Sequence, residues 1–206
     1  MIVVVDHGLG NLRSVAMKFA RLKVEAAVSA DPAAILGADK LVLPGVGSFD
    51  AAMENLRAAG LVEALDEAVL VRKIPILGIC LGMQLFTRGS EEGSLPGLGW
   101  IDGDTRKLVP SPGGEKLRVP HVGWNTLTAR EGSPLFSGIA PGERYYFVHS
   151  YAVFCDDPEQ VAAETTYGPT FASAVRRGNI YGTQFHPEKS HHHGLAMLEN
   201  FTRLAD

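Results

Sequence analysis

Ile74-Pro-Ile-Leu-Gly-Ile-Cys-Leu-Gly-Met-Gln84 is the segment of this chain whose pattern says most about its fold. The apolar run from Ile74 to Ile79 is too short for a helix and predicts a buried strand, whereas Leu81 to Phe86 has the spacing of an amphipathic helix. Cys80 then lies in the turn between strand and helix, with a glycine two residues away on either side. Such a Gly-x-Cys-x-Gly turn is the cysteine counterpart of the nucleophile elbow, in which glycines let a strained turn pack tightly and expose the nucleophile. The helix start favours a thiolate; a buried structural cysteine is the alternative interpretation.

Length, charge and cysteine usage limit the classes of protein that fit. The chain has 206 residues, enough for one well-buried domain, and we expect residues 1–206 to form a single domain. The net charge of -4, with acidic and basic residues interspersed, offers no basic surface for nucleic acid. The apolar run Ile2 to Val5 is too short for a signal peptide and no run is long enough for a membrane span, so we expect a cytoplasmic protein without membrane contact. Cys80 and Cys155 are the only cysteines, and isolated cysteines in a reducing compartment are more often free or catalytic than bridged.

The chain as far as Gly89 alternates between strand and helix patterns. Strands are predicted at Ile2 to Val5, Val24 to Val28, Lys40 to Leu43 and in the segment before Cys80. Between them we expect a helix after Asn11, a short helical connection after Asp31-Pro32, and a helical pair from Phe49 to Arg72 that is capped by Ser48 and broken at Gly60. This alternation predicts an α/β fold with a mostly parallel central sheet flanked by helices on both faces.

After Gly89 the pattern changes to loops and β-rich segments. Residues 90–114 are rich in glycine and proline and predict loops around a strand near Trp100 to Val109. Further strands are predicted at Gly123 to Thr128, Tyr145 to Phe154, Val161 to Thr166, Phe171 to Arg176 and Asn179 to Phe185. The last predicted element is a helix with Leu195, Leu198, Phe201 and Leu204 on one face. We therefore expect a β-rich addition to the parallel sheet.

Thr183-Gln-Phe-His-Pro-Glu188 supplies the partners that a cysteine nucleophile needs. A thiol requires a general base, and the base requires a third group that fixes its tautomer and stabilises its positive charge. His186 and Glu188, two residues apart just after a strand, fit those two roles, and Pro187 stiffens the turn between them. A histidine near a carboxylate is by itself usually polar surface, so the prediction depends on the combination with Cys80.

Gly78-Ile-Cys-Leu-Gly-Met-Gln84 and His186-Pro-Glu188 together closely resemble the paired signatures of class I glutamine amidotransferases, in the same order and across nearly the whole chain. The resemblance implies a flavodoxin-like fold and a Cys80–His186–Glu188 triad that hydrolyses the side-chain amide of L-glutamine through a thioester and releases ammonia, with no cofactor. Pro44-Gly-Val-Gly47 resembles the oxyanion loop of that family, and a simple glycine turn is the alternative. The oxyanion and glutamine-binding residues implied in this way are Val46, Gly47, Leu81, Gln84, His149, Ser150 and Tyr151.

Three other segments resemble one branch of that family, the glutaminase subunits of imidazole glycerol phosphate synthases. They are Asp6-His-Gly-Leu-Gly-Asn-Leu-Arg-Ser-Val15, Pro120-His-Val-Gly-Trp-Asn125 and Tyr145-Tyr-Phe-Val-His-Ser-Tyr151. The branch implies a heterodimer with a (β/α)8-barrel cyclase subunit, which uses the ammonia to form imidazole glycerol phosphate and an aminoimidazole carboxamide ribonucleotide in histidine biosynthesis. The candidate contacts with that subunit are Gly10, Asn11, His121, Trp124 and Asn125. Taken singly, Trp124 also fits an ordinary core strand position, and His7 stands where the branch usually carries tyrosine.

The residues alone leave other interpretations open. A glutaminase for another synthase, such as the GMP or anthranilate type, would share the triad but lack the three branch segments. A stand-alone thiol hydrolase on the same elbow would act on esters or peptides, and a binding module would use Cys80 only structurally. His191-His-His193 suggests a metal site, but neighbouring residues on a helix point about 100° apart and cannot all reach one ion, so we expect no metal.

Overall fold

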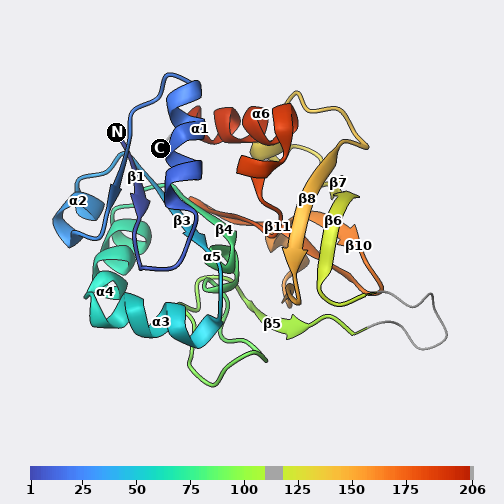
Figure 1. Cartoon of the computed structure of the whole chain (residues 1–206), viewed down its shortest axis with the longest axis horizontal. Helices are drawn as coiled ribbons and strands as arrows, with labels where there is room; N and C mark the ends of the chain where they lie inside the picture. The colour runs from blue at the N-terminus through green and yellow to red at the C-terminus, as the bar shows by residue number, and fades with distance from the viewer. Residues whose placement is uncertain (110–117, 205–206) are drawn as a thin grey trace.

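The computed structural model describes residues 1–109 and 118–204, and its central sheet confirms the predicted alternation of strand and helix (Figure 1). Strand β4 (Ile76–Cys80) lies between β3 (Lys40–Gly45) and β12 (Ile180–Thr183), and beyond β3 follow β1 (Ile2–Val5) and β2 (Ala26–Ser29). All of these neighbours pair in parallel. The nucleophile candidate Cys80 therefore ends a central strand of the parallel part of the sheet.

The second half of the chain extends this sheet with antiparallel strands. Next to β12 come β11 (Thr170–Arg177), β10 (Val161–Thr166) and β7 (Thr128–Ala129). Strand β9 (Tyr151–Cys155) pairs with β11 and with β5 (Gly103–Lys107), while β6 (His121–Thr126) and β8 (Arg144–His149) form a separate antiparallel pair. The central sheet is thus mixed, and the predicted β-rich addition is confirmed. Residues 110–114 of the predicted loop region lie outside the described residues.

Alternate residues of the parallel strands face two different sets of helices. On β1, Val3 and Val5 pack in one core with α2 (Pro32–Leu36), α3 (Phe49–Ala58) and α4 (Leu61–Asp66). Ile2 and Val4 pack in a second core with α1 (Leu12–Arg21) and α6 (His191–Thr202). Figure 1 shows α1 and α6 on one side of the sheet and α3 and α4 on the other. Because both faces are covered, these strands are continuous apolar runs.

Short helical segments complete the chain. They are the π-helical turn η1 (Glu67–Val71), α5 (Leu81–Gln84) and the 3-10 turns η2 (Pro134–Phe136), η3 (Pro158–Gln160) and η4 (Pro187–Lys189). No helix within residues 1–109 and 118–204 has both the length and the apolar character to cross a membrane.

The predicted helix break is confirmed, but the predicted caps are not. Gly60 separates α3 from α4 with a left-handed φ of +65°. Asn11 and Ser48 occupy the N-cap positions of α1 and α3, yet their side chains make no capping hydrogen bond. For α3 the cap comes from Glu92, whose Oε2 accepts a hydrogen bond from the backbone N–H of Phe49 at 2.9 Å. A carboxylate at a helix start also interacts favourably with the helix dipole.

Two further predictions differ from the structure in detail. The predicted strand Tyr145 to Phe154 is two strands, β8 and β9, because the chain passes at Ser150 from the small sheet to the central sheet. The buried face of α6 consists of Gly194, Met197, Leu198 and Phe201. Leu195 and Leu204 are only partly buried, so the predicted stripe is displaced by part of a turn.

Candidate active site

Cys80 lies in a strained turn at the carboxyl end of β4, as predicted. Its φ of +55° and ψ of −108° fall in a region that residues other than glycine rarely adopt. The flanking glycines permit close packing: a Cβ on Gly82 would lie 1.7 Å from the carbonyl oxygen of Leu43, and one on Gly78 would lie 2.6 Å from Phe86. The following helix α5 was predicted to be amphipathic, and this prediction is wrong: the helix has four residues and all of them are buried.

Strand pairing brings two distant segments to the same edge of the sheet as Cys80. Gly45 on β3 lies beside Cys80, so the loop Val46-Gly47 begins there. On the other side, Thr183 on β12 lies beside Ile79, and His186 follows three residues later. The carboxyl ends of parallel strands are where α/β proteins usually place their ligand sites.

His186 and Glu188, which were predicted from the sequence to act as a pair, are hydrogen-bonded to each other and buried. Nδ1 of His186 donates a hydrogen bond to Oε1 of Glu188 at 2.8 Å. Nε2 of His186 is left for Cys80 and makes no hydrogen bond of regular geometry to any residue that the structure describes. Burial alone lowers the pKa of His186, but the interactions with Cys80 and Glu188 outweigh it and raise the pKa to about 9. The ring is therefore suited to be a cation beside a thiolate, with its tautomer held by Glu188.

A cleft of about 300 Å³ opens over this edge of the sheet. Cys80 and His186 line it together with all the residues implied for oxyanion and glutamine binding, namely Val46, Gly47, Leu81, Gln84, His149, Ser150 and Tyr151. Gly47, the last residue of the predicted oxyanion loop, has a φ of +105°, a conformation that favours glycine. The structure thus gathers the predicted residues in one cavity, with Glu188 behind His186.

Hydrogen bonds between buried polar groups shape one wall of the cleft. The carbonyl oxygen of Tyr151 accepts from Gln84 Nε2 at 2.9 Å and from His149 Nδ1 at 2.8 Å. Since a carbonyl can only accept, His149 carries its proton on Nδ1, and its Nε2 accepts from Nδ1 of His121 at 3.0 Å. Burial lowers the pKa of His149 to about 3 and that of His121 to about 4. Both rings are therefore neutral near pH 7.

The sequence is similar to those of known proteins over its whole length. The family model described as glutamine amidotransferase class-I matches residues 3–204. The chain belongs to the class I glutamine amidotransferase family. It is 45% identical over 205 residues to imidazole glycerol phosphate synthase subunit HisH 2 of Methanococcus maripaludis, with 100% of each chain covered. It is 48% identical to subunit HisH 1 of Campylobacter jejuni subsp. jejuni, covering 99% of this chain and 100% of that one.

A solved structure shows that the fold of the amidotransferase is shared more widely. PurLQS from Thermotoga maritima matches with a TM-score of 0.72 and 17% identity, over 98% of this chain and 96% of that chain. At this identity the likeness concerns the fold alone. The expected amidotransferase fold, with a central sheet between two layers of helices, is confirmed.

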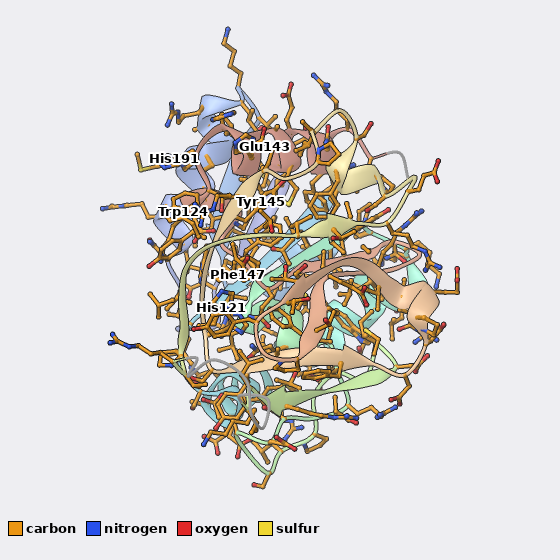
Figure 2. All side chains as sticks on the ribbon, turned by 90° about the vertical axis from the view of Figure 1, so that its right-hand side faces the viewer. His121, Trp124, Glu143, Tyr145, Phe147 and His191 are labelled. Atoms are coloured by element: carbon orange, nitrogen blue, oxygen red, sulfur yellow. The ribbon has the colours of Figure 1, made fainter. Side chains whose placement is uncertain are left out.

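The amidotransferase exposes only some of the residues predicted to contact a partner. Gly10 and Asn125 are partly exposed, Asn11 is exposed, and Trp124 is 37% exposed. The ring of Trp124 stacks on His191, with centroids 4.8 Å apart and planes 4° apart (Figure 2). The prediction for His121 is wrong, because its side chain is only 3% exposed and stacks between Phe147 and Tyr167. Strand alternation along β6 places residues 121 and 124 on opposite faces.

The histidines with no role in the predicted triad have structural contacts in the amidotransferase. His7 is buried, and its Nε2 donates to the carbonyl oxygen of Pro44 at 2.7 Å, which ties the N-terminal loop to the predicted oxyanion loop. His193 pairs with Glu143 at 2.7 Å, whereas His191 packs on Trp124. Within the described ranges, no three side chains of metal-ligating type come together.

Sequence reasoning missed several residues around the cleft of the amidotransferase. Glu92, Pro120 and Val148 also line it, and Gln184 approaches the sulfur of Cys80. Glu92 lies in a glycine-rich loop that carried no signal. Gln184 lies two residues before His186, and two residues is the repeat that places side chains on the same side of an extended chain. That spacing was an available signal.

Proposed function

We propose that this chain is the glutaminase subunit of an imidazole glycerol phosphate synthase, which releases ammonia from L-glutamine for a cyclase subunit in histidine biosynthesis. The main support is that Cys80, in its strained turn, shares a cleft of about 300 Å³ with His186, which Glu188 hydrogen-bonds from behind. Full-length relatives named as subunits of that synthase support the choice of synthase. Cys80, His186 and Glu188 are the catalytic triad, and the chemistry needs no cofactor or metal.

In the first half-reaction the Cys80 thiolate attacks the side-chain carbonyl carbon of glutamine, and a C–S bond forms. Negative charge develops on the carbonyl oxygen, where the backbone N–H of Leu81 and an N–H of the Val46-Gly47 loop donate hydrogen bonds. The C–N bond then breaks, and the imidazolium of His186 gives its proton to the leaving nitrogen. Neutral ammonia departs and a glutamyl thioester is left on Cys80.

In the second half-reaction water attacks the thioester while Nε2 of His186 takes one of its protons. The C–S bond breaks, glutamate leaves, and the pair of thiolate and imidazolium is restored. Glu188 keeps Nε2 directed at the reacting atoms through its hydrogen bond to Nδ1. With the reacting atoms at Nε2 and Glu188 at Nδ1, His186 thus acts first as an acid and then as a base.

Gln84, His149, Ser150 and Tyr151 hold the substrate in this proposal, since all four line the cleft. The lowered pKa of His149 matters here, because burial keeps the ring neutral and avoids a second cation near His186. A neutral wall leaves His186 as the positive charge beside the thiolate. Glutamine is then oriented by hydrogen bonds and by the shape of the cleft.

The partner is a cyclase subunit with a (β/α)8 barrel, and we place it on the β6–β8 face, defined as Val122, Trp124, Tyr146 and Val148. These residues form two cross-strand pairs, Val122 with Val148 and Trp124 with Tyr146. Val122 is 55% exposed and Trp124 is 37% exposed, and neighbouring exposed apolar side chains are typical of an interaction site. Val148 also lines the cleft, so a partner seated here would cover its rim. The exposed loop at Gly10 and Asn11 and the partly exposed Asn125 belong to the same proposed heterodimer contact.

Partner control follows from the chemistry of ammonia. In water near pH 7 ammonia is mostly ammonium, which is not a nucleophile, so it has to reach the cyclase through a passage that excludes water. Hydrolysis without an acceptor would waste glutamine. We therefore expect low activity until a partner with its ligand is bound.

The test is the steady-state rate of glutamine hydrolysis by the purified chain, by the chain with the cyclase, and by that complex with a ribonucleotide ligand. Because one misplaced oxyanion donor costs about 10²- to 10³-fold in rate, we expect the complete complex to exceed the isolated chain by about 100-fold or more. Equal rates in all three states would refute partner control. Turnover of an ester or thioester probe without glutamine hydrolysis would refute the glutaminase function.

A further inference from the structure

Gln184 is a fully buried amide beside the proposed nucleophile. It follows β12, and its backbone N–H donates to the carbonyl oxygen of Ser173 at 2.9 Å. Its side chain is 0% exposed, and its Nε2 lies 3.6 Å from Sγ of Cys80. The same short segment therefore carries both Gln184 and His186 to the sulfur.

The direction of the Gln184 amide is set by a backbone atom. The carbonyl oxygen of Tyr151 can only accept, so the group of Gln84 that contacts it at 2.9 Å is the NH₂. That NH₂ also donates to Oε1 of Gln184 at 3.1 Å. With its oxygen engaged by Gln84, Gln184 has to present its own NH₂ to Cys80.

Besides its interaction with His186, the sulfur has hydrogen-bond contacts with Val148 and Gln184, and these two suit different charge states. The carbonyl oxygen of Val148, 3.9 Å away, accepts a hydrogen bond from a neutral thiol but repels a thiolate. The NH₂ of Gln184 donates, and hydrogen bonds to a charged acceptor are stronger than those to a neutral one. Gln184 therefore favours the charged sulfur, and it does so without carrying a charge.

We propose that Gln184 is a positioning residue for Cys80: its amide hydrogen-bonds the thiolate and, oriented by Gln84, holds the sulfur toward the cleft. This inference rests on the proposed function, in which Cys80 is the nucleophile. Several ionisable groups lie around the same cleft. His186, His149, Tyr151 and Glu92 line the same cleft, and Glu188 lies behind His186. The test therefore compares pH profiles between variants that retain all of these groups.

The experiment measures alkylation of Cys80 by iodoacetamide as a function of pH in a Cys155→Ala background, which leaves Cys80 as the single thiol. Gln184→Met replaces the amide by an apolar side chain of similar length and so removes the NH₂ that donates to the sulfur. Since a hydrogen bond to a charged group is worth about one order of magnitude in an equilibrium, we expect alkylation near pH 7 to slow about tenfold and the profile to move to higher pH. In the full complex kcat for glutamine should fall about tenfold and KM should change less.

Gln160→Met is the matched control. Gln160 is also a buried glutamine, and its amide bonds Asp102 through both ends, at 2.9 Å and 2.8 Å. It lies outside the cleft lining, so its loss should affect stability and leave the alkylation profile of Cys80 unchanged. An equal shift in both variants would mean a general effect of removing a buried amide and would overturn the inference.

A folded Gln184→Met variant with the unsubstituted pH profile would also overturn it. Should Gln184→Met fail to fold, Gln184→Glu retains the shape and replaces the donor by a carboxylate, so alkylation should slow even more; an unchanged profile there has the same negative meaning. Failure of the proposed function looks different. In that case Gln184→Met still shifts the alkylation of Cys80, but the unsubstituted complex does not hydrolyse glutamine.

Discussion

Cys80 is held in a conformation that its own backbone disfavours. A residue with a side chain at φ +55° and ψ −108° is strained by on the order of 1–3 kcal/mol, which the surrounding packing has to offset. The contacts of Gly78 and Gly82 with Phe86 and Leu43 show how closely the turn is enclosed. In this conformation Cys80 lies at the edge of the second core and lines the cleft.

Replacing Cys80 separates strain from chemistry. Cys80→Ala and Cys80→Gly should both abolish glutamine hydrolysis, while the complex should still form product from supplied ammonium. Cys80→Gly should have a larger free energy of unfolding than Cys80→Ala, by on the order of 1 kcal/mol, because glycine tolerates a positive φ. Urea unfolding and a glutaminase assay measure the two effects. Near-normal turnover in either variant would exclude Cys80 as nucleophile.

His186 and Glu188 should differ in how much their loss costs. His186→Ala removes proton transfer and the cation beside the sulfur, whereas Glu188→Gln leaves an imidazole that is only less well oriented. We expect the first to lower kcat by at least about 10³-fold and the second by a smaller factor, although effects within a triad are not additive. Single-turnover rates of thioester formation in the full complex provide the measurement. The reverse order would contradict these roles.

The β6–β8 pair shows both the success and the limit of prediction from sequence. The strands were predicted, because alternating apolar residues bounded by turns are a local signal. Which face of β6 is buried was not predicted, because that depends on Phe147 and Tyr167, which reach His121 only after folding. The alternation itself was sufficient to assign His121 and Trp124 to opposite faces.

In the site, too, residues marked by local sequence signals were predicted, and residues that depend on contacts between distant segments were not. Cys80, His186 and Glu188 were found from short motifs whose geometry is fixed locally. Gln184 acquires its contact only through the pairing of β12 with β4, between residues 104 positions apart. The capping of α3 by Glu92 likewise joins distant segments. The two-residue spacing of Gln184 and His186 indicates a shared side of the extended chain, but no local pattern shows that Gln184 reaches Cys80 or that Glu92 reaches Phe49.

The buried His121–His149 pair should reduce stability in mild acid. The pKa values of about 4 and about 3 lie below the usual 6.5, so below pH 6.5 the unfolded chain binds protons that the folded chain does not. The free energy of unfolding should therefore fall as the pH drops from 6.5 toward 4. His186 acts in the opposite direction, but its contribution is complete below pH 6.5 and is lost only as the pH rises through about 9.

Urea unfolding at about pH 6.5 and about pH 5 measures this loss. In His149→Gln the amide keeps hydrogen-bonding capacity and does not titrate, so the difference between the two pH values should be smaller. Over this range the expected change is on the order of 1 kcal/mol for each histidine. A variant with the same pH dependence as the unsubstituted chain would show that other groups cause the loss.

The molecule as a whole separates its scaffold from its proposed docking surface. Helices cover both faces of the parallel half of the sheet, whereas β6 and β8 stand apart as a pair at the other end of the molecule (Figure 1). Their Val148 reaches the cleft and their Trp124 faces outward, so one small element connects the catalytic cavity with the surface. A partner bound there would contact the site without disturbing either core.

Trp124 should therefore anchor the cyclase. Trp124→Ala removes a large aromatic side chain that is stacked on His191 and partly exposed, and loss of such an anchor typically weakens binding by about tenfold or more. Val71→Ala is the control, because Val71 is 67% exposed on η1, away from the β6–β8 face. Titration calorimetry with the cyclase gives both affinities. Equal binding by the Trp124 variant and the Val71 variant would remove Trp124 from the interface.

The position of β12 has a consequence for the synthesis of the protein. This strand lies between β4 and β11, yet it is made after both of them. While the ribosome has not yet released residues 180–183, the nascent chain exposes the unpaired edges of two apolar strands, which favour association with other chains. Before this segment is in place, the thiol of Cys80 lacks both the base His186 and the amide donor Gln184. The late insertion of one four-residue strand therefore brings the proposed base and the amide donor to Cys80 in the same event.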